Sequence, residues 1–279
     1  MKIGVRLHDL GKSTPSELAK KAKEIGFDGV QLVLNKAIEG ETGLAGTLSK
    51  EKANEISKAF ADEGLEIFMM GAYFNPVHSN KELVAKNIAK FKEHLQYCND
   101  FDCKYVGSET GSFNDDKWTY NPLNRTPEAI AEVKRIFKEL ADTAKEYNSN
   151  VAIEGAFGHC CHEPKVLNDV IQSIDNGHVY VTVDMYNYLA ISNYSEQRKI
   201  FDECVSLFAD KTVIFHIKDF IVEEDNIKQV AIGKGIMDYN YMLPIIKQKF
   251  PNAYLIFEGS KPADMHESFE FITKKLQEA

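Results

Sequence analysis

The feature that most constrains the fold of this chain is the regular recurrence of short apolar segments. Each segment is β-branched and almost continuously apolar, which is typical of strands that are covered on both faces. With 279 residues, the chain offers about 35 residues to each segment, which is enough for one strand and one helix. The eight predicted strands are residues 2–7, 28–34, 66–71, 104–108, 150–154, 179–184, 212–217 and 254–258.

The segments between these strands carry helix signals. Thr14 and Thr126 each place a capping hydroxyl before a proline, the residue that is favoured at the first helical position. Residues 81–97 and 130–141 repeat apolar side chains at helical spacing. No linker rich in Pro, Gly or Ser divides the chain. The alternation therefore predicts an α/β fold, a (β/α)8 TIM barrel in which residues 1–279 form a single domain, with a doubly wound open sheet as the competing topology.

Composition excludes several classes of protein. The 33 Lys and Arg against 42 Asp and Glu give a net charge of −9, which opposes binding to a nucleic acid backbone. No stretch approaches the 18 apolar residues of a membrane span, and the first residues turn polar too early for a signal peptide. The five cysteines show no disulfide pattern. We therefore expect a cytoplasmic protein with neither a membrane nor a nucleic acid partner.

The last four predicted strands each end in an ionisable residue, which is costly to bury. These residues are Glu154, Asp184, His216 and Glu258, each of which directly follows an apolar run. Because the carboxyl ends of barrel strands meet at one mouth, these side chains should lie together. One such residue is often a helix cap, but four in succession are hard to explain in that way. Crowded carboxylates need a cation, and oxygen ligands with one imidazole suit a divalent metal ion: Mn²⁺, Mg²⁺ or Co²⁺, with Zn²⁺ possible.

Other polar residues fall near the same predicted mouth. Lys218 lies two residues after His216 and so points to the same side of an extended strand. His8, Tyr73 and Glu109 follow other strands, as does Gln31, and any of them could line a pocket or play a structural role. His159 begins the run His159-Cys160-Cys161-His162, whose contiguous residues cannot readily wrap one zinc ion, so we interpret His159 as a loop residue that faces the substrate. His94 is expected on a helix surface.

Several motifs carry a resemblance to a known family. The chain resembles the xylose-isomerase-like TIM barrels, the group of sugar phosphate isomerases and epimerases that shares its fold with AP endonuclease IV. The resemblance covers nearly the whole chain and is strongest from about Gly71 onward. The motifs are GAYFNPVHSN at 71–80, SETGSFN at 108–114, IEGAFGH at 153–159, VDMYNYL at 183–189, FHIKDF at 215–220, GKGIMDY at 233–239 and FEG at 257–259.

The resemblance implies both a metal set and a reaction. The family's Glu–Asp–His–Glu ligands map onto Glu154, Asp184, His216 and Glu258. The implied activity is that of a metal-dependent isomerase or epimerase, which moves a proton in a ketose or related polyol carbonyl compound through an enediolate. Glu154 and Glu258 would exchange the proton, while Lys218 would serve as an electrophile or as an ion-pair partner. Family members are often dimers or tetramers, so a homo-oligomer is possible.

Two departures from the family pattern leave the substrate open. Asn187 stands where several family members carry a histidine that touches the substrate, and Val222 stands where the ketose 3-epimerases carry an arginine. We still expect Asn187 among the substrate contacts, together with Lys218, His159, Glu109, Tyr73 and His8. The scarcity of arginine, with four in the chain, favours a neutral carbohydrate over a multiply phosphorylated one.

Three other functions compete with this prediction. A keto-sugar or keto-inositol dehydratase differs from the isomerase by one later step, the loss of water. An AP endonuclease needs extra histidines near the positions of Tyr73, Glu109 and Asn187, and the net charge opposes it. A non-catalytic binding barrel would not need the acid/base pair that Glu154 and Glu258 provide.

Overall fold

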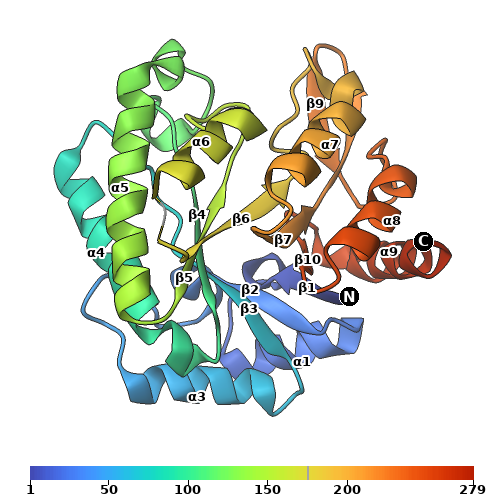
Figure 1. Cartoon of the computed structure of the whole chain (residues 1–279). Helices are drawn as coiled ribbons and strands as arrows, with labels where there is room; N and C mark the ends of the chain where they lie inside the picture. Colours follow the sequence, from blue (N-terminus) through green and yellow to red (C-terminus); the bar gives the residue numbers. More distant parts are fainter. Residues whose placement is uncertain (175) are drawn as a thin grey trace.

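The barrel predicted from the sequence is present, and the open-sheet alternative is wrong. The computed structural model describes residues 1–174 and 176–279. Within these residues, eight parallel strands close into a barrel in the order β1-β10-β7-β6-β5-β4-β3-β2 (Figure 1). The strands are β1 (Lys2–Arg6), β2 (Gly29–Leu32), β3 (Glu66–Gly71), β4 (Tyr105–Glu109), β5 (Asn150–Glu154), β6 (Val179–Asp184), β7 (Thr212–Ile217) and β10 (Tyr254–Phe257).

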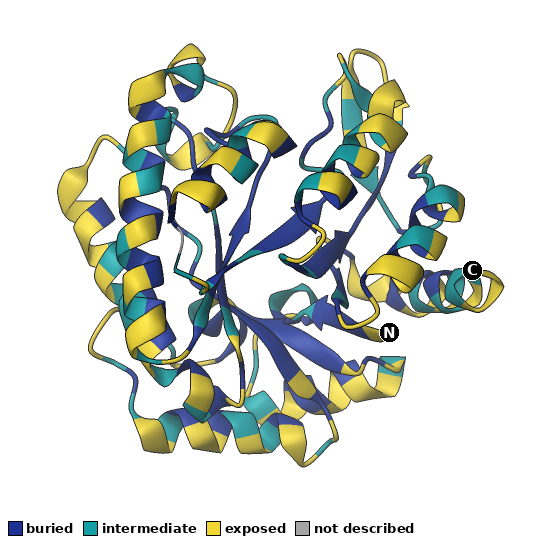
Figure 2. Ribbon diagram, viewed as in Figure 1, coloured by how far each residue is buried: buried dark blue, intermediate teal, exposed yellow. Residues whose placement is uncertain are grey.

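Helices surround the barrel, with their exposed faces outward and their buried faces against the strands (Figure 2). The hydroxyls of Thr14 and Thr126 accept hydrogen bonds from the backbone N–H groups of Glu17 and Ala129, so both predicted caps are confirmed. No helix in the described part of the chain is long and apolar enough to cross a membrane. The helices are α1 (Pro15–Ile25), α2 (Leu34–Ala37), α3 (Lys50–Ala61), α4 (Lys81–Tyr97), α5 (Pro127–Glu146), α6 (Pro164–Ile174), α7 (Gln197–Leu207), α8 (Tyr239–Lys249) and α9 (Met265–Glu278).

The interior of the barrel is filled below its mouth. Phe68 points inward from β3 and stacks on Tyr254, with ring centroids 4.0 Å apart. Gly4 and Gly29 make room for it, because a Cβ atom at either position would lie within 2.6 Å of the Phe68 ring. Met69 and other apolar residues complete this small interior cluster. Because side chains fill the interior, a functional site is expected at the carboxyl ends of the strands.

One hairpin was not predicted. After β7 the chain forms β8 (Asp219–Glu223) and β9 (Asn226–Val230), which pair in antiparallel fashion. The segment carries no Asn-Gly or Asp-Gly turn signal, and its turn uses Glu224 with a φ of 54°. Gln229 of the hairpin donates a hydrogen bond to the backbone carbonyl of Glu258, at 2.7 Å. The hairpin therefore supports the last residue of the predicted metal set.

We predicted His94 on the surface of its helix. This prediction is wrong, because His94 lies on the buried face of α4. Only 2 % of its surface is exposed, and its Nδ1–H donates to the backbone carbonyl of Lys90 at 2.8 Å. Burial lowers the pKa of His94 to about 4 from its ordinary value of 6.5. The prediction failed because a single polar residue within an amphipathic pattern does not reveal which face packs inward.

The buried His94 predicts a pH-dependent stability. The unfolded chain binds a proton at this ring below about pH 6.5, whereas the folded protein does so only near pH 4. The unfolding free energy therefore decreases as the pH is lowered from about 6.5 to about 4. We expect His94 to remove about 2 kcal/mol of unfolding free energy between pH 7 and pH 5. Urea unfolding of the wild type and of a His94→Gln variant at both pH values measures this share. Equal losses in the two proteins would contradict the prediction, since the other histidines titrate in both.

Candidate metal centre

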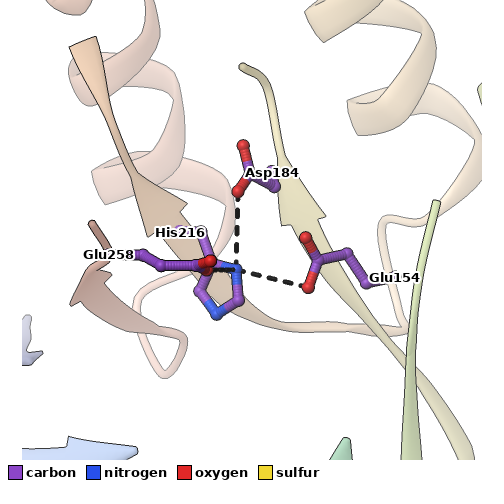
Figure 3. Close-up of side chains that lie close together, drawn as sticks. All are labelled: Glu154, Asp184, His216 and Glu258. Atoms are coloured by element: carbon purple, nitrogen blue, oxygen red, sulfur yellow. Dashed lines mark ion pairs between the residues drawn. The ribbon is translucent and has the colours of Figure 1, made fainter. Parts of the chain in front are cut away.

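Four side chains from consecutive strands of the barrel converge at its mouth. Glu154 and Asp184 are the last residues of β5 and β6, His216 precedes the last residue of β7, and Glu258 directly follows β10. One ligand atom of each residue lies within 4.8 Å of the corresponding atoms of the other three, and no second group of this kind occurs among the described residues. The convergence predicted from the strand ends is therefore present (Figure 3).

The Nδ1 atom of His216 lies between the three carboxylates. It is 2.7 Å from Glu258 Oε2, 3.3 Å from Glu154 Oε2 and 3.6 Å from Asp184 Oδ2 (Figure 3). Although His216 Nδ1 and Asp184 Oδ2 are buried, neither makes a well-directed hydrogen bond. Leaving a buried polar atom such as His216 Nδ1 without a hydrogen-bond partner is costly. Three carboxylate oxygens and one imidazole nitrogen match the ligands of a divalent cation, so these residues fit one metal ion.

The pKa shifts in the cluster show that it lacks positive charge. Burial lowers the pKa of His216, but Glu258 and Glu154 outweigh burial and raise it well above its ordinary value. Burial raises the pKa of Glu154. Burial and then the charges of Glu154 and Glu258 raise the pKa of Glu109 well above its usual range. The protein therefore favours protons at several of these groups, which a bound cation would displace.

Lys218 supplies part of the missing charge. Its side chain is buried, and its Nζ lies 2.7 Å from Asp184 Oδ2 and 3.1 Å from Glu258 Oε1. Despite burial, these carboxylates raise the pKa of Lys218. The expected ion pair with a mouth carboxylate is therefore present. The same Lys218 and His216 hold the pKa of Glu258 well below its ordinary value, against the effect of burial.

Asn187 lies among the predicted ligands. Its backbone N–H donates to Asp184 Oδ1 at 3.0 Å, and its side-chain Nδ2 donates to Glu154 Oε1 at 2.6 Å. Its Oδ1 accepts a hydrogen bond from Lys218 Nζ at 3.2 Å. Asn187 therefore fixes the orientation of two carboxylates, a role that its place in the sequence did not indicate.

A cavity of about 280 Å³ opens beside the cluster. Three of the predicted pocket residues, His8, Tyr73 and Glu109, line it. His159 does not line it: its Nε2–H donates to the backbone carbonyl of Trp118 at 3.1 Å, and its ring packs edge-to-face against the Trp118 indole. Its Nδ1 lies 3.8 Å from Glu109 Oε1. The cavity is lined by Arg6, His8, Lys36, Tyr73, Glu109, Asp116, Trp118 and Glu258.

Four residues of this cavity were not predicted from the sequence: Arg6, Lys36, Asp116 and Trp118. Arg6 donates from Nη1 to Glu258 Oε1 at 2.6 Å and holds Asp9 with its other nitrogens. A signal existed, since Arg6 ends the first strand as the other mouth residues end theirs. Trp118 lies in the long loop before α5, where nothing in the local sequence places it over the mouth.

These features together define a class: a closed parallel barrel with a carboxylate–imidazole cluster at the carboxyl ends of its strands. The chain belongs to the xylose isomerase-like TIM barrel family, whose profile matches residues 19–275. The resemblance noted from the sequence motifs is thereby confirmed.

Solved structures agree on the fold. The chain is similar to a xylose isomerase-like TIM barrel protein from Mycobacterium smegmatis in complex with magnesium (TM-score 0.76, 16% identity, 99% of this chain and 97% of that one). It is also similar to a D-psicose 3-epimerase (TM-score 0.73, 15% identity, 99% of both chains). A third is a probable 3-DHS dehydratase from Bacillus anthracis (TM-score 0.72, 12% identity, 98% of this chain and 99% of that one). No curated protein sequence matches the chain.

Proposed function

We propose that this protein is an enzyme, a divalent-metal-dependent isomerase or epimerase that acts on a ketose or related polyol carbonyl compound. The observation that carries the proposal is the placement of two glutamates around one candidate metal centre. Glu154 and Glu258 approach His216 from opposite sides (Figure 3). Two carboxylates on opposite sides of a substrate can remove a proton from one face and return it to the other. Similarity in fold to a D-psicose 3-epimerase supports the proposal.

The proposed roles follow from the contacts. Glu154, Asp184, His216 and Glu258 would hold one ion, with Mn²⁺, Mg²⁺ or Co²⁺ favoured and Zn²⁺ possible. When bound, such an ion supplies a Lewis acid that stabilises negative charge on a substrate oxygen. One of the two glutamates, Glu154 or Glu258, removes a proton from the substrate carbon, and the other returns a proton to the substrate. Asp184 and His216 serve only as ligands.

The remaining residues position the substrate. Lys218 places a buried ammonium group beside the two carboxylates that flank it, where it can stabilise an oxygen anion. We propose contacts from Lys218, Asn187, Glu109, Tyr73 and His8, with His159 acting from behind Glu109. Arg6 is already paired with Asp9 and Glu258, so it offers no free guanidinium to a phosphate. This pairing favours a neutral carbohydrate as the small-molecule substrate.

A screen of ketoses, keto-inositols and sugar phosphates with Mn²⁺ in D₂O tests the proposal. An isomerase or epimerase should place solvent deuterium at a carbon next to the carbonyl of an intact sugar. If no compound in any of the three groups exchanges a proton or changes configuration, the proposed activity is wrong.

Three further predictions accompany this proposal. We propose that residues 1–279 form one domain, that the protein is cytoplasmic, and that it forms a homo-oligomer.

One observation favours a dehydratase as the second candidate. Glu109 lines the cavity and provides a carboxyl group in addition to the two glutamates of the proposed metal set. Loss of a β-hydroxyl as water requires a proton donor at that oxygen, which a third carboxyl group can provide. In the same screen, a dehydratase would produce a new enone absorbance instead of deuterium in an unchanged sugar.

A further inference from the structure

A buried amide, that of Gln31, connects the side of the barrel opposite the proposed ligands to His216. The four proposed ligands come from β5, β6 and β7 and from the end of β10, whereas Gln31 is the third residue of β2. None of the surface of Gln31 is exposed. Its side chain spans the barrel between Tyr73, which follows β3, and His216 on β7.

The hydrogen bonds of Gln31 determine which nitrogen of His216 carries the proton. Gln31 Nε2 donates to Tyr73 Oη at 2.8 Å, which leaves Gln31 Oε1 facing His216 Nε2, also at 2.8 Å. An amide oxygen can only accept a hydrogen bond, so His216 Nε2 must donate. A neutral imidazole carries one N–H group, so Nδ1 keeps a free lone pair, and this is the atom that faces the three carboxylates.

We propose that Gln31 is a positioning residue of the metal centre, which holds His216 in its Nε2–H tautomer so that the ion is bound through Nδ1. The inference rests on the proposed metal site. Tyr73 extends the arrangement, because its hydroxyl accepts a hydrogen bond from Gln31 Nε2 and anchors the far end of the amide. With the amide reversed, its NH₂ group would face Nε2, the proton would move to Nδ1, and the imidazole would have no lone pair toward the carboxylates.

Two substitutions at Gln31 and the titration of each protein with Mn²⁺ test this role. Gln31→Met has a similar length but no acceptor, and we expect its affinity for Mn²⁺, measured by calorimetry, to fall by about 10- to 100-fold. Gln31→Glu restores an acceptor for His216 Nε2–H and should recover most of that loss. Circular dichroism of the metal-free proteins checks that each variant folds.

Nitrogen NMR of the histidine rings in the Zn²⁺-loaded wild type gives a second readout, one that a merely structural residue would not affect. It should show His216 protonated at Nε2 and metal-bound at Nδ1. If Gln31→Met does not fold, Tyr73→Phe carries the test, because it removes the hydrogen-bond partner of Gln31 Nε2 and should lower the affinity for Mn²⁺. Unchanged Mn²⁺ affinity in Gln31→Met, or in Tyr73→Phe where that variant carries the test, would overturn the inference while leaving the metal site intact. Ligation through Nε2 would do the same. A wild type that binds neither ion would overturn the proposed function as well.

Discussion

Replacement of Glu258 by Gln should lower turnover by about 10²- to 10⁴-fold, the usual contribution of a residue that transfers a proton. A glutamine keeps an oxygen that can face His216 Nδ1, from which the carboxylate lies 2.7 Å, but it cannot take up a proton. Its amide would also lose the ion pair with Arg6. We therefore expect a moderate loss of Mn²⁺ affinity and a far larger loss of turnover, both measured on the best substrate of the deuterium screen.

The matched control for this experiment is Glu128→Gln. Glu128 is an exposed glutamate in the first turn of α5, so the substitution changes the net charge equally without touching the mouth. The control should keep the wild-type turnover. If Glu258→Gln also keeps it, the proton does not pass through Glu258 and the proposed mechanism is wrong.

The second large effect concerns stability with and without the metal ion. Mn²⁺ at 100 times its dissociation constant should raise the unfolding free energy of the wild type by about 2.7 kcal/mol, because the ion binds only the folded protein. In Asp184→Asn this increase should nearly vanish at the same concentration. Asp184 is fully buried, and an asparagine there would remove one anionic ligand and the carboxylate that pairs with Lys218 at 2.7 Å. Urea unfolding with Mn²⁺ and with a chelator measures both values.

The control in this case is Asp62→Asn, since Asp62 is exposed at the end of α3, where it pairs with Lys58. It should show the full increase on addition of Mn²⁺. An equal increase in Asp184→Asn would mean that the ion binds elsewhere, and the four-residue site would have to be abandoned.

The site residues that could be predicted from the sequence are those at or next to the end of an apolar strand segment. Glu154, Asp184 and His216 each end or nearly end a buried apolar run, so their positions follow once the runs are assigned to a parallel barrel. Closure of the barrel then brings residues 30 or more positions apart to one mouth. Neither step requires knowledge of side-chain packing.

The other parts depend on contacts between distant segments. Gln31 reaches His216 across 185 residues, and only the assembled barrel shows that its amide oxygen meets an imidazole nitrogen. Trp118 comes to the mouth on a loop that distant residues hold, among them Asn75 and His159 through hydrogen bonds to its backbone carbonyls. His94 carries no sequence signal of burial beyond its helical register. Such choices are decided by packing, which periodicity does not encode.

The pairing of β1 with β10 has a consequence for when the proposed metal ion can bind during synthesis. Arg6 contacts Glu258 across 252 residues, and β1 forms hydrogen bonds with β10 only when the final strand has emerged. A nascent chain that lacks β10 also lacks the fourth ligand and the guanidinium that holds it. Binding of the proposed ion should therefore wait until β10 has been made and coincide with closure of the barrel.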